Sequence, residues 1–474
     1  MIMPKFITTT LGCKVNQCES ESIANLMTSS GWTQAGDGTC ANACIINTCT
    51  VTRRASMQSR QAIRQAIRSN PGAVIIVTGC YAETEPDELR KIEGIDRIIG
   101  NKEKEKIYEI IKNEFEPKRR ALITPKVQPI SMAGGSADPI PHDRICLSPP
   151  EADCSGKFQS SINGNGFMHT SATRSGNRTR AFLKIQDGCD AFCTYCIVPY
   201  ARGRSRSMQV QSVIESVNNL QKAGYREVVL SGIHLGKYGQ DLSPGTTFTA
   251  LLELITDSCI IDRIRLSSIE PNELTPGIIK LAAESGKICR HFHIPLQSGD
   301  DRILKKMHRP YTREYFKDLI IRIKESIPDA AIGVDILAGF PGETDEAFHN
   351  TYSLIDELPV SYLHVFPYSP RKKTPAADFP EQVPDGVIRA RCTEMRRLGT
   401  LKKADFYKKA AGTRADLLIE DKRDEKSGLL KGISSNYLSV LMKGEDRIRN
   451  RIVKVRIDKS CGDHATGQME NRKI

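Results

Sequence analysis

The stretch IQDGCDAFCTYCIVPYARGRSRS, residues 185–207, carries three cysteines within eight positions: Cys189, Cys193 and Cys196. A zinc ion or an iron–sulfur cubane held by thiolates normally takes four ligands. The next cysteine or histidine after this group is His234, too far along the chain for a compact zinc knuckle. The C-x3-C-x2-C spacing therefore favours a cubane with three protein ligands and one iron left open to a non-protein ligand.

The bulk composition sets limits on the rest of the protein. A chain of 474 residues is too long for one core, so two to four domains are expected. The net charge of +12 suggests RNA or DNA as a partner, although a merely basic soluble protein would also carry it. Fifteen cysteines in a chain without a signal peptide or a long apolar run indicate metal or catalytic sites in a cytoplasmic protein. No membrane partner is expected.

The first part of the chain alternates strand-like and helix-like runs. Apolar runs at 5–13, 43–49 and 73–80, with helical patterns near 19–30 and 53–69, predict an open parallel α/β sheet. The three strand-like runs end in Cys13, Cys49 and Cys80, respectively. Because the carboxyl ends of parallel strands lie on one edge, these cysteines are expected to meet there. Buried cysteines are common, but three at equivalent places favour a shared metal site.

The remaining chain divides into three further segments. Residues 117–180 are rich in Pro, Ser and Gly and are interpreted as a weakly ordered linker. Six strand-like runs between 181 and 369, separated by helical patterns, predict a partial (β/α)6 barrel that extends to residue 408. Short β runs after the basic helix 386–410 predict a small C-terminal β-barrel over 409–474. Its lysines and arginines favour nucleic-acid contact over a merely solvated face. Cys146, Cys154, His142 and His169, inside the linker, match no finger pattern and are interpreted as bystanders.

The cysteine motif, with Tyr195 before its last cysteine, resembles the radical SAM enzymes, in which S-adenosylmethionine (SAM) chelates the open iron. The resemblance extends in order over nearly the whole chain, to the methylthiotransferase family. The motifs that carry it are TLGCKVNQCESE, NTCTVT, TGCYAE, DGCDAFCTYCIVPYARGRSRS, LSGIHLGKYG, RLSSIEP, HIPLQSGDD, MHRPYT, DILAGFPGET and FPYSPRKKTPA. It implies an α/β fold of three parts: an N-terminal sheet domain (1–116), a radical SAM partial barrel (181–408) and an RNA-binding TRAM barrel (409–474).

The resemblance also implies cofactors and ligands. Cys189, Cys193 and Cys196 would hold the radical SAM 4Fe–4S cluster, and Cys13, Cys49 and Cys80 an auxiliary 4Fe–4S cluster. The family reaction uses two SAM molecules, one to methylate a sulfur on the auxiliary cluster and one to generate the radical that removes hydrogen from the substrate carbon. The strand ends of the barrel suggest the SAM contacts: Gly232, Glu270, Gln297 and Gly339. His234 and Tyr238 are further candidates, with ordinary packing as the alternative.

Members of the family divide by target into three groups. TLGCKVNQ and CIVPYARGRSRS resemble the group that adds a methylthio group to C2 of N6-threonylcarbamoyladenosine beside the tRNA anticodon. The alternatives are isopentenyladenosine in tRNA, an aspartate of a ribosomal protein, or a non-enzymatic iron–sulfur protein that binds RNA. The implied partners are tRNA, a reductant such as flavodoxin or ferredoxin, and a sulfur donor. Two departures are Cys18, at a position that is usually aromatic, and the long 117–180 segment.

Overall fold

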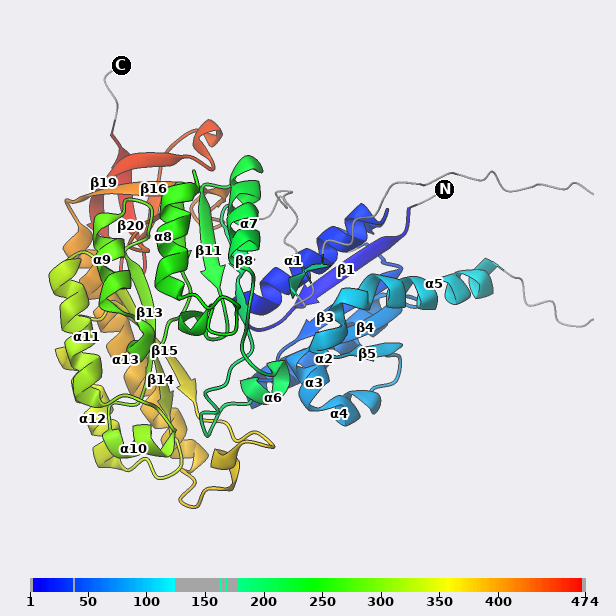
Figure 1. Ribbon diagram of the computed structural model, residues 1–474, viewed down its shortest axis with the longest axis horizontal. Coiled ribbons are helices and arrows are strands. Elements are labelled where there is room, and N and C mark those ends of the chain that lie inside the picture. The colour runs from blue at the N-terminus through cyan, green and yellow to red at the C-terminus, as the bar shows by residue number, and fades with distance from the viewer. Residues whose placement is uncertain (1–2, 37–38, 124–161, 164–166, 169–177, 471–474) are drawn as a thin grey trace, which may run out of the picture.

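The computed structural model describes residues 3–36, 39–123, 162–163, 167–168 and 178–470. Figure 1 shows an N-terminal sheet domain, a central barrel and a small C-terminal barrel, as the sequence predicts. Most of the predicted linker 117–180, including Cys146, Cys154, His142 and His169, lies outside the described residues. Helix α5 (Ile107–Ile123) continues past residue 116, and the short strands β6 (Ile162–Asn163) and β7 (Phe167–Met168) pair with each other. The domain bounds themselves stay a prediction.

The N-terminal domain is a five-stranded sheet in the order β2-β1-β3-β4-β5, and all of its strand pairs are parallel. The two central strands are buried along their whole length, as expected for a parallel sheet covered on both faces. The strands are β1 (Lys5–Thr10), β2 (Thr33–Gln34), β3 (Ala43–Thr48), β4 (Val74–Gly79) and β5 (Arg97–Ile99). The helices are α1 (Lys14–Ser29), α2 (Arg53–Ser69), α3 (Cys80–Thr84), α4 (Pro86–Arg90), the 3-10 helix η1 (Asn101–Lys106) and α5.

The central domain is a partial barrel of six parallel strands. Two three-stranded sheets, β8-β11-β12 and β13-β14-β15, are joined by the isolated parallel bridges Ile264–Ile288 and Ser268–His293. Because strand side chains alternate, Phe292, Ile294 and Leu296 pack in the outer core under the helices, and His291 and His293 project from the opposite face. The strands are β8 (Ala181–Lys184), β11 (Glu227–Ser231), β12 (Arg263–Leu266), β13 (His291–Gln297), β14 (Ala331–Ala338) and β15 (Tyr362–Pro367).

Helices and short pairings complete this domain. The helices that alternate with its strands are α7 (Val210–Lys222), α8 (Phe248–Ser258), α9 (Pro276–Glu284), α11 (Arg313–Ser326) and α12 (Asp345–Glu357). Between the barrel strands lie β9 (Gln186–Asp187), α6 (Val198–Arg202), β10 (Arg206–Ser207), η2 (Leu235–Lys237), η3 (Pro271–Glu273) and α10 (Asp301–Lys306), and η4 (Pro375–Asp378) follows β15. The antiparallel β9–β10 pair brackets the loop that carries the first cysteine motif.

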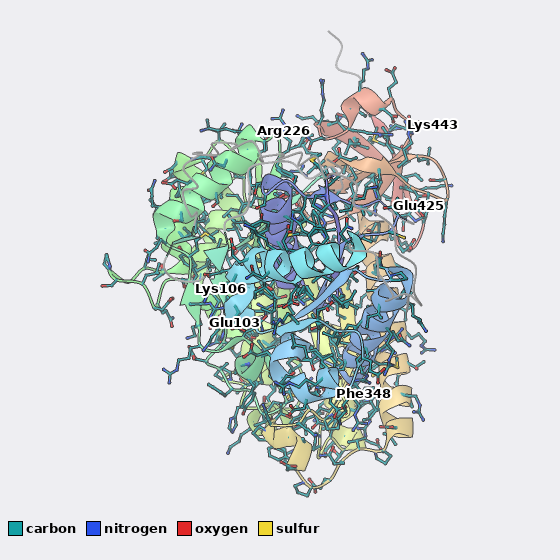
Figure 2. All side chains as sticks on the ribbon, turned by 90° about the vertical axis from the view of Figure 1, so that its right-hand side faces the viewer. Glu103, Lys106, Arg226, Phe348, Glu425 and Lys443 are labelled. Atoms are coloured by element: carbon teal, nitrogen blue, oxygen red, sulfur yellow. The ribbon has the colours of Figure 1, made fainter. Side chains whose placement is uncertain are left out.

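The long helix α13 (Asp385–Ala410) leads into a closed five-stranded barrel in the order β16-β17-β18-β20-β19. This barrel closes the amino end of the central one, because Arg263 and Arg265 of β12 donate hydrogen bonds to its backbone carbonyls. Figure 2 shows Glu425 and Lys443 projecting from it. Its elements are β16 (Arg414–Arg423), β17 (Leu430–Ser434), β18 (Ser439–Met442), η5 (Asp446–Ile448), β19 (Ile452–Ser460) and β20 (Ala465–Met469). Among the described helices, none combines the length and the apolar sequence that a bilayer span requires.

Candidate metal centres

Cys13, Cys49 and Cys80 come directly or almost directly after β1, β3 and β4, which are neighbours in the sheet. The sheet therefore brings together three thiols that are far apart in the sequence. The three thiols also interact electrostatically, because Cys13 and Cys80 each raise the pKa of the Cys49 thiol. The approach is close at Gly12, where a Cβ atom would lie 2.8 Å from the Cys49 Sγ. Glycine at this position, with φ of +97°, makes that approach sterically feasible.

A side chain of α2 holds the backbone of Cys49, and β3 and β4 approach each other closely just before Cys80. The Ser59 hydroxyl of α2 donates to the carbonyl of Cys49 at 2.9 Å and accepts from its amide at 3.2 Å. Gly79, with φ of +96°, ends β4, and a Cβ atom there would lie 2.4 Å from the Thr48 carbonyl oxygen. Burial raises the pKa of Cys49 to about 11 and also raises that of Cys80. Thiolates at this edge therefore need cations beside them, such as the irons of a cluster.

One such cation comes from the central domain. Arg202, at the end of α6, is 1% exposed and lies against helix α1 of the N-terminal domain. It donates to Glu19 at 2.8 Å, to Asn16 at 2.5 Å and to Asp187 at 2.9 Å. Its positive charge lowers the pKa of Cys80 against the effect of burial. The N-terminal thiols therefore share a buried boundary with the domain that carries the other cysteine motif.

Further charges extend this buried ion network across the boundary. Lys104 binds Glu19 at 2.5 Å, and Lys184 binds Glu19 at 3.0 Å and Asp187 at 3.2 Å. Burial alone would raise the pKa of Glu19, but Arg202, Lys104 and Lys184 hold it well below its usual range. These three buried cations face two buried carboxylates, so the network has an excess of positive charge beside the thiols. A buried excess of this sign fits an anionic group held by the three cysteines.

Sequence reasoning did not single out this network. Arg202 lies within the quoted stretch 185–207 and Glu19 within TLGCKVNQCESE, so both stood next to predicted ligands. Their pairing joins residues 183 positions apart and requires the docked domains.

Cys189, Cys193 and Cys196 lie together on the loop between β9 and β10. The Cys189 amide donates to the Gly203 carbonyl at 3.0 Å, and the Cys196 amide donates to the Cys193 carbonyl at 2.9 Å. Gly188 has φ of +73°, and a Cβ atom there would lie 1.9 Å from the Arg204 carbonyl oxygen. The loop thus presents three thiols through its own hydrogen bonds, a donor set that suits a cubane with one open iron.

A cavity of about 560 Å³ adjoins this loop and is lined by Cys193, His234, Glu270, Glu273 and Arg309 among others. His234 contacts the Cys189 Sγ with its Nδ1 at 3.2 Å and Glu273 with its Nε2 at 2.8 Å. Arg309 donates to the Cys193 Sγ at 3.4 Å and pairs with Glu270. Burial raises the pKa of the Cys193 thiol, and Arg309 opposes this effect. The cavity offers charged groups of both signs beside the thiols, which suits a zwitterionic amino-acid moiety.

The four predicted SAM contacts are placed differently. Glu270 lines the cavity, whereas Gly232 follows β11 and packs against Gln186. Gln297 ends β13 with φ of +67°. Gly339 follows β14, where a Cβ atom would lie 2.4 Å from Ile388 of α13. The SAM roles of all four stay predictions. Arg309, which lies within the quoted motif MHRPYT, donates to the Cys193 Sγ but was not assigned a role from the sequence.

Comparison with known proteins gives these sites a context. Residues 183–355 match the radical SAM superfamily, and residues 5–100 match the uncharacterized protein family UPF0004. The chain is 38% identical over 461 residues to the threonylcarbamoyladenosine tRNA methylthiotransferase MtaB of Bacillus subtilis, covering 97% of this chain and 95% of that protein. The chain belongs to the radical SAM methylthiotransferase family. The family implies SAM and a 4Fe–4S cluster as cofactors.

One further relative by sequence and one solved structure are similar to this methylthiotransferase. The tRNA-2-methylthio-N(6)-dimethylallyladenosine synthase of Pelotomaculum thermopropionicum is 32% identical, covering 98% of this chain and 97% of that protein. Among solved structures, the radical SAM methyltransferase TsrM of Kitasatospora setae has a TM-score of 0.53 at 15% identity, covering 79% of this chain and 74% of that chain. That likeness concerns the fold alone.

The methylthiotransferase has a second, larger cavity of about 980 Å³ between β15, α13 and the C-terminal barrel. Aromatic side chains lie among basic ones along it, a combination that suits a nucleic-acid strand. The basic lining residues are Arg180, Lys403, Lys422, Arg423, Lys426 and Lys431, and the aromatic ones include Tyr362, His364, Phe406, Tyr407, Tyr437 and His464. Acidic residues such as Glu420 and Asp424 also line it, so its charge is mixed rather than uniformly positive.

One wall of this cavity continues into the central barrel. His293, Asp335 and His364 lie on the adjacent strands β13, β14 and β15, with Asp335 Oδ1 at 3.0 Å from His293 Nε2 and 3.3 Å from His364 Nδ1. Burial would raise the pKa of Asp335, but the two histidines lower it to about 2. The barrel interior is therefore polar and charged where the larger cavity meets it.

Proposed function

We propose that the chain adds a methylthio group to C2 of N6-threonylcarbamoyladenosine beside the anticodon of tRNA, with two 4Fe–4S clusters and two SAM molecules per product. The observation that carries this proposal is the full-length similarity to relatives named threonylcarbamoyladenosine tRNA methylthiotransferase. These include the Bacillus subtilis protein at 38% identity and the Aquifex aeolicus protein at 33%.

In this proposal Cys189, Cys193 and Cys196 hold the radical SAM cluster, and the adjoining cavity holds SAM. A reduced cluster of this kind supplies one electron for the cleavage of SAM. Glu270 and Arg309 lie on the wall of the cavity beside Cys193, where they would orient the amino and carboxylate groups of the cosubstrate. His234, held between Cys189 and Glu273, fixes the same wall.

Cys13, Cys49 and Cys80 hold the auxiliary cluster in this proposal, which supplies a site for the sulfur that is transferred. The fit rests on the donor set and on the buried charges, since Arg202 and its neighbours provide the positive excess that an anionic cluster requires. The aromatic and basic cavity beside the C-terminal barrel supports tRNA as the substrate. The reductant and the sulfur donor stay predictions.

The substrate is tested by mass spectrometry of tRNA nucleosides from cells with and without the gene. Loss of 2-methylthio-N6-threonylcarbamoyladenosine on deletion, with recovery on complementation, is the expected result. Persistence of this nucleoside in a strain without a paralogue would overturn the assignment. Loss of 2-methylthio-isopentenyladenosine instead would favour the second candidate, which the 32% identical relative of Pelotomaculum thermopropionicum supports.

The enzymatic proposal is separated from a non-enzymatic iron–sulfur protein by anaerobic reconstitution. About eight irons per chain are expected for two cubanes. Reductant, SAM and substrate tRNA should then yield 5′-deoxyadenosine and S-adenosylhomocysteine. A single cluster, or SAM left intact under these conditions, would contradict the proposal.

A further inference from the structure

Three side chains that commonly bind metals converge inside the central barrel. His293, Asp335 and His364 belong to the adjacent strands β13, β14 and β15, which Figure 1 labels. In the strand register Asp335 is the direct partner of His364, and His293 is the partner of Gly333, two residues before Asp335. Because side chains alternate along a strand, all three project from the face opposite the apolar core under the helices.

The three ligand atoms form a nearly regular triangle. Asp335 Oδ1 lies 3.0 Å from His293 Nε2 and 3.3 Å from His364 Nδ1, and the two nitrogens are 3.1 Å apart. Zinc binds such atoms at about 2.0 to 2.2 Å, so with octahedral to tetrahedral angles its ligands are about 2.8 to 3.6 Å apart. All three edges lie within this range. A metal ion in front of the triangle therefore contacts all three atoms with little movement of the side chains.

Hydrogen bonds alone cannot satisfy this triangle. A neutral imidazole carries one hydrogen, on one of its two nitrogens. If one histidine donates to the other, the accepting nitrogen has no hydrogen for Asp335, and if both donate to Asp335, their hydrogens face each other. Asp335 Oδ1 is in fact a buried oxygen that accepts no well-directed hydrogen bond from the described residues. A divalent cation attracts all three lone pairs at once and removes this conflict.

Ser268 holds the His293 ring from the other side. Its hydroxyl lies 2.6 Å from His293 Nδ1, the nitrogen that does not belong to the triangle. When Nε2 binds a metal, Nδ1 carries the ring hydrogen and donates it to the Ser268 oxygen. Such an outer partner, which fixes the tautomer and the orientation of the ring, is typical of histidines that bind metals. The side chains of His293 and Asp335 are only 11% and 17% exposed, so water competes little for these two ligands.

His364 connects the triangle with the larger cavity of about 980 Å³. Its side chain is 53% exposed and lines that cavity. Three protein ligands leave a further coordination position open, as in catalytic rather than structural zinc sites. An oxygen or nitrogen donor of a molecule in the cavity can complete the coordination there.

We propose that His293, Asp335 and His364 bind one divalent first-row transition-metal ion such as Zn²⁺. Two imidazole nitrogens and one carboxylate suit this class of ion, whereas Mg²⁺ and Ca²⁺ prefer oxygen ligands throughout. The ion is chemically distinct from the irons of the proposed clusters, because no thiolate is among its ligands. The inference does not depend on which nucleoside the enzyme modifies.

The test measures zinc binding by the full chain after anaerobic reconstitution of its clusters. The protein is dialysed against a zinc buffer, and its zinc and iron contents are determined by inductively coupled plasma mass spectrometry. The wild type should bind about one zinc ion more than Asp335→Asn or His364→Gln, at equal iron content. Ser268→Ala should weaken zinc binding about tenfold. Zinc should raise the Tm of the wild type but not that of the two ligand variants.

His349→Gln changes an exposed histidine of α12 and is the matched control, which should bind zinc as the wild type does. If Asp335→Asn unfolds or loses iron, the half-exposed His364 still provides the comparison. Equal zinc contents in the wild type and His364→Gln would show that zinc binds elsewhere, for example at cysteines, and the inference would be wrong. A wild type that binds no zinc, or that Mg²⁺ stabilises equally, would also overturn it.

Discussion

The two three-cysteine sites are built in opposite ways. Cys189, Cys193 and Cys196 lie on one loop whose own backbone hydrogen bonds shape it. Cys13, Cys49 and Cys80 come from three strands, and they meet because those strands are neighbours in a parallel sheet. The first site is local in the sequence, and the second depends on the tertiary fold and on a second domain.

The charged groups around the two sites also differ in origin. We call Cys189, Cys193 and Cys196 the loop site, and Cys13, Cys49 and Cys80 the sheet site. The loop site has His234 and Arg309 beside its thiols, both from the barrel domain that carries the loop. The sheet site receives the positive charge of Arg202 from the neighbouring domain, through a network that is buried at the boundary. Damage to domain docking should therefore affect the sheet site first.

Removing one cysteine from each site should give the largest effects. Cys196→Ala should abolish SAM cleavage and product formation, because the radical chemistry begins at its cluster. Cys80→Ala should abolish the methylthio product but retain reductive SAM cleavage, since it leaves the loop untouched. Each variant should retain about four of eight irons. Iron analysis and quantification of 5′-deoxyadenosine check this, and full product formation by Cys80→Ala would exclude Cys80 as a required ligand.

Arg202→Met tests the dependence of the sheet site on the other domain. The change leaves Glu19 and Asp187 with less buried positive charge, and breaking a buried ion pair costs about 3 to 5 kcal/mol. The variant should lose iron from the sheet site before the loop site, so product should fall further than SAM cleavage. Measurement combines anaerobic thermal unfolding with iron and 5′-deoxyadenosine analysis.

Arg206→Met is the matched control for this change. Arg206 binds the same Asp187 at 2.9 Å but is 26% exposed, so water compensates for part of its loss. It should have the smaller effect on stability and iron content. Equal loss of iron from both sites in Arg202→Met would show that the two sites do not differ in their need for the boundary.

The same contrast explains what the sequence could predict. The loop motif can be recognised from spacing alone, and the strand-terminal cysteines could be grouped because parallel strands share an edge. The fold class, the barrel and the family were predicted correctly. The pairing of Arg202 with Glu19 had no sequence signal, because periodicity and spacing describe one element at a time. Such contacts depend on how domains dock.

Glycines at the sheet site offer a finer test. Gly12→Ala would place a Cβ atom 2.8 Å from the Cys49 Sγ and would also strain a backbone with φ of +97°. Gly31→Ala has a similar φ, +85°, but no atom within 4 Å of the added carbon. Both should lose about 1 to 3 kcal/mol of stability from backbone strain. Gly12→Ala should in addition lose iron from the sheet site, and similar iron contents in the two variants would contradict the close approach.

The smallest expected effect lies away from both thiol sites, at His291. Burial lowers its pKa well below 6.5, and the nearby cations Arg265, Lys14 and Arg180 lower it further. The unfolded chain therefore binds a proton more readily than the folded one, so folding stability declines as the pH falls below about 6.5, by up to about 1.4 kcal/mol per pH unit. His291→Gln removes this titration and should flatten the decline between pH 7 and pH 5.5, with both clusters retained. Thermal unfolding of the anaerobic holoprotein at matched pH values measures the difference. Identical slopes for the wild type and the variant would show that His291 is not held neutral. A changed iron content would show that His291 and the thiol sites are coupled.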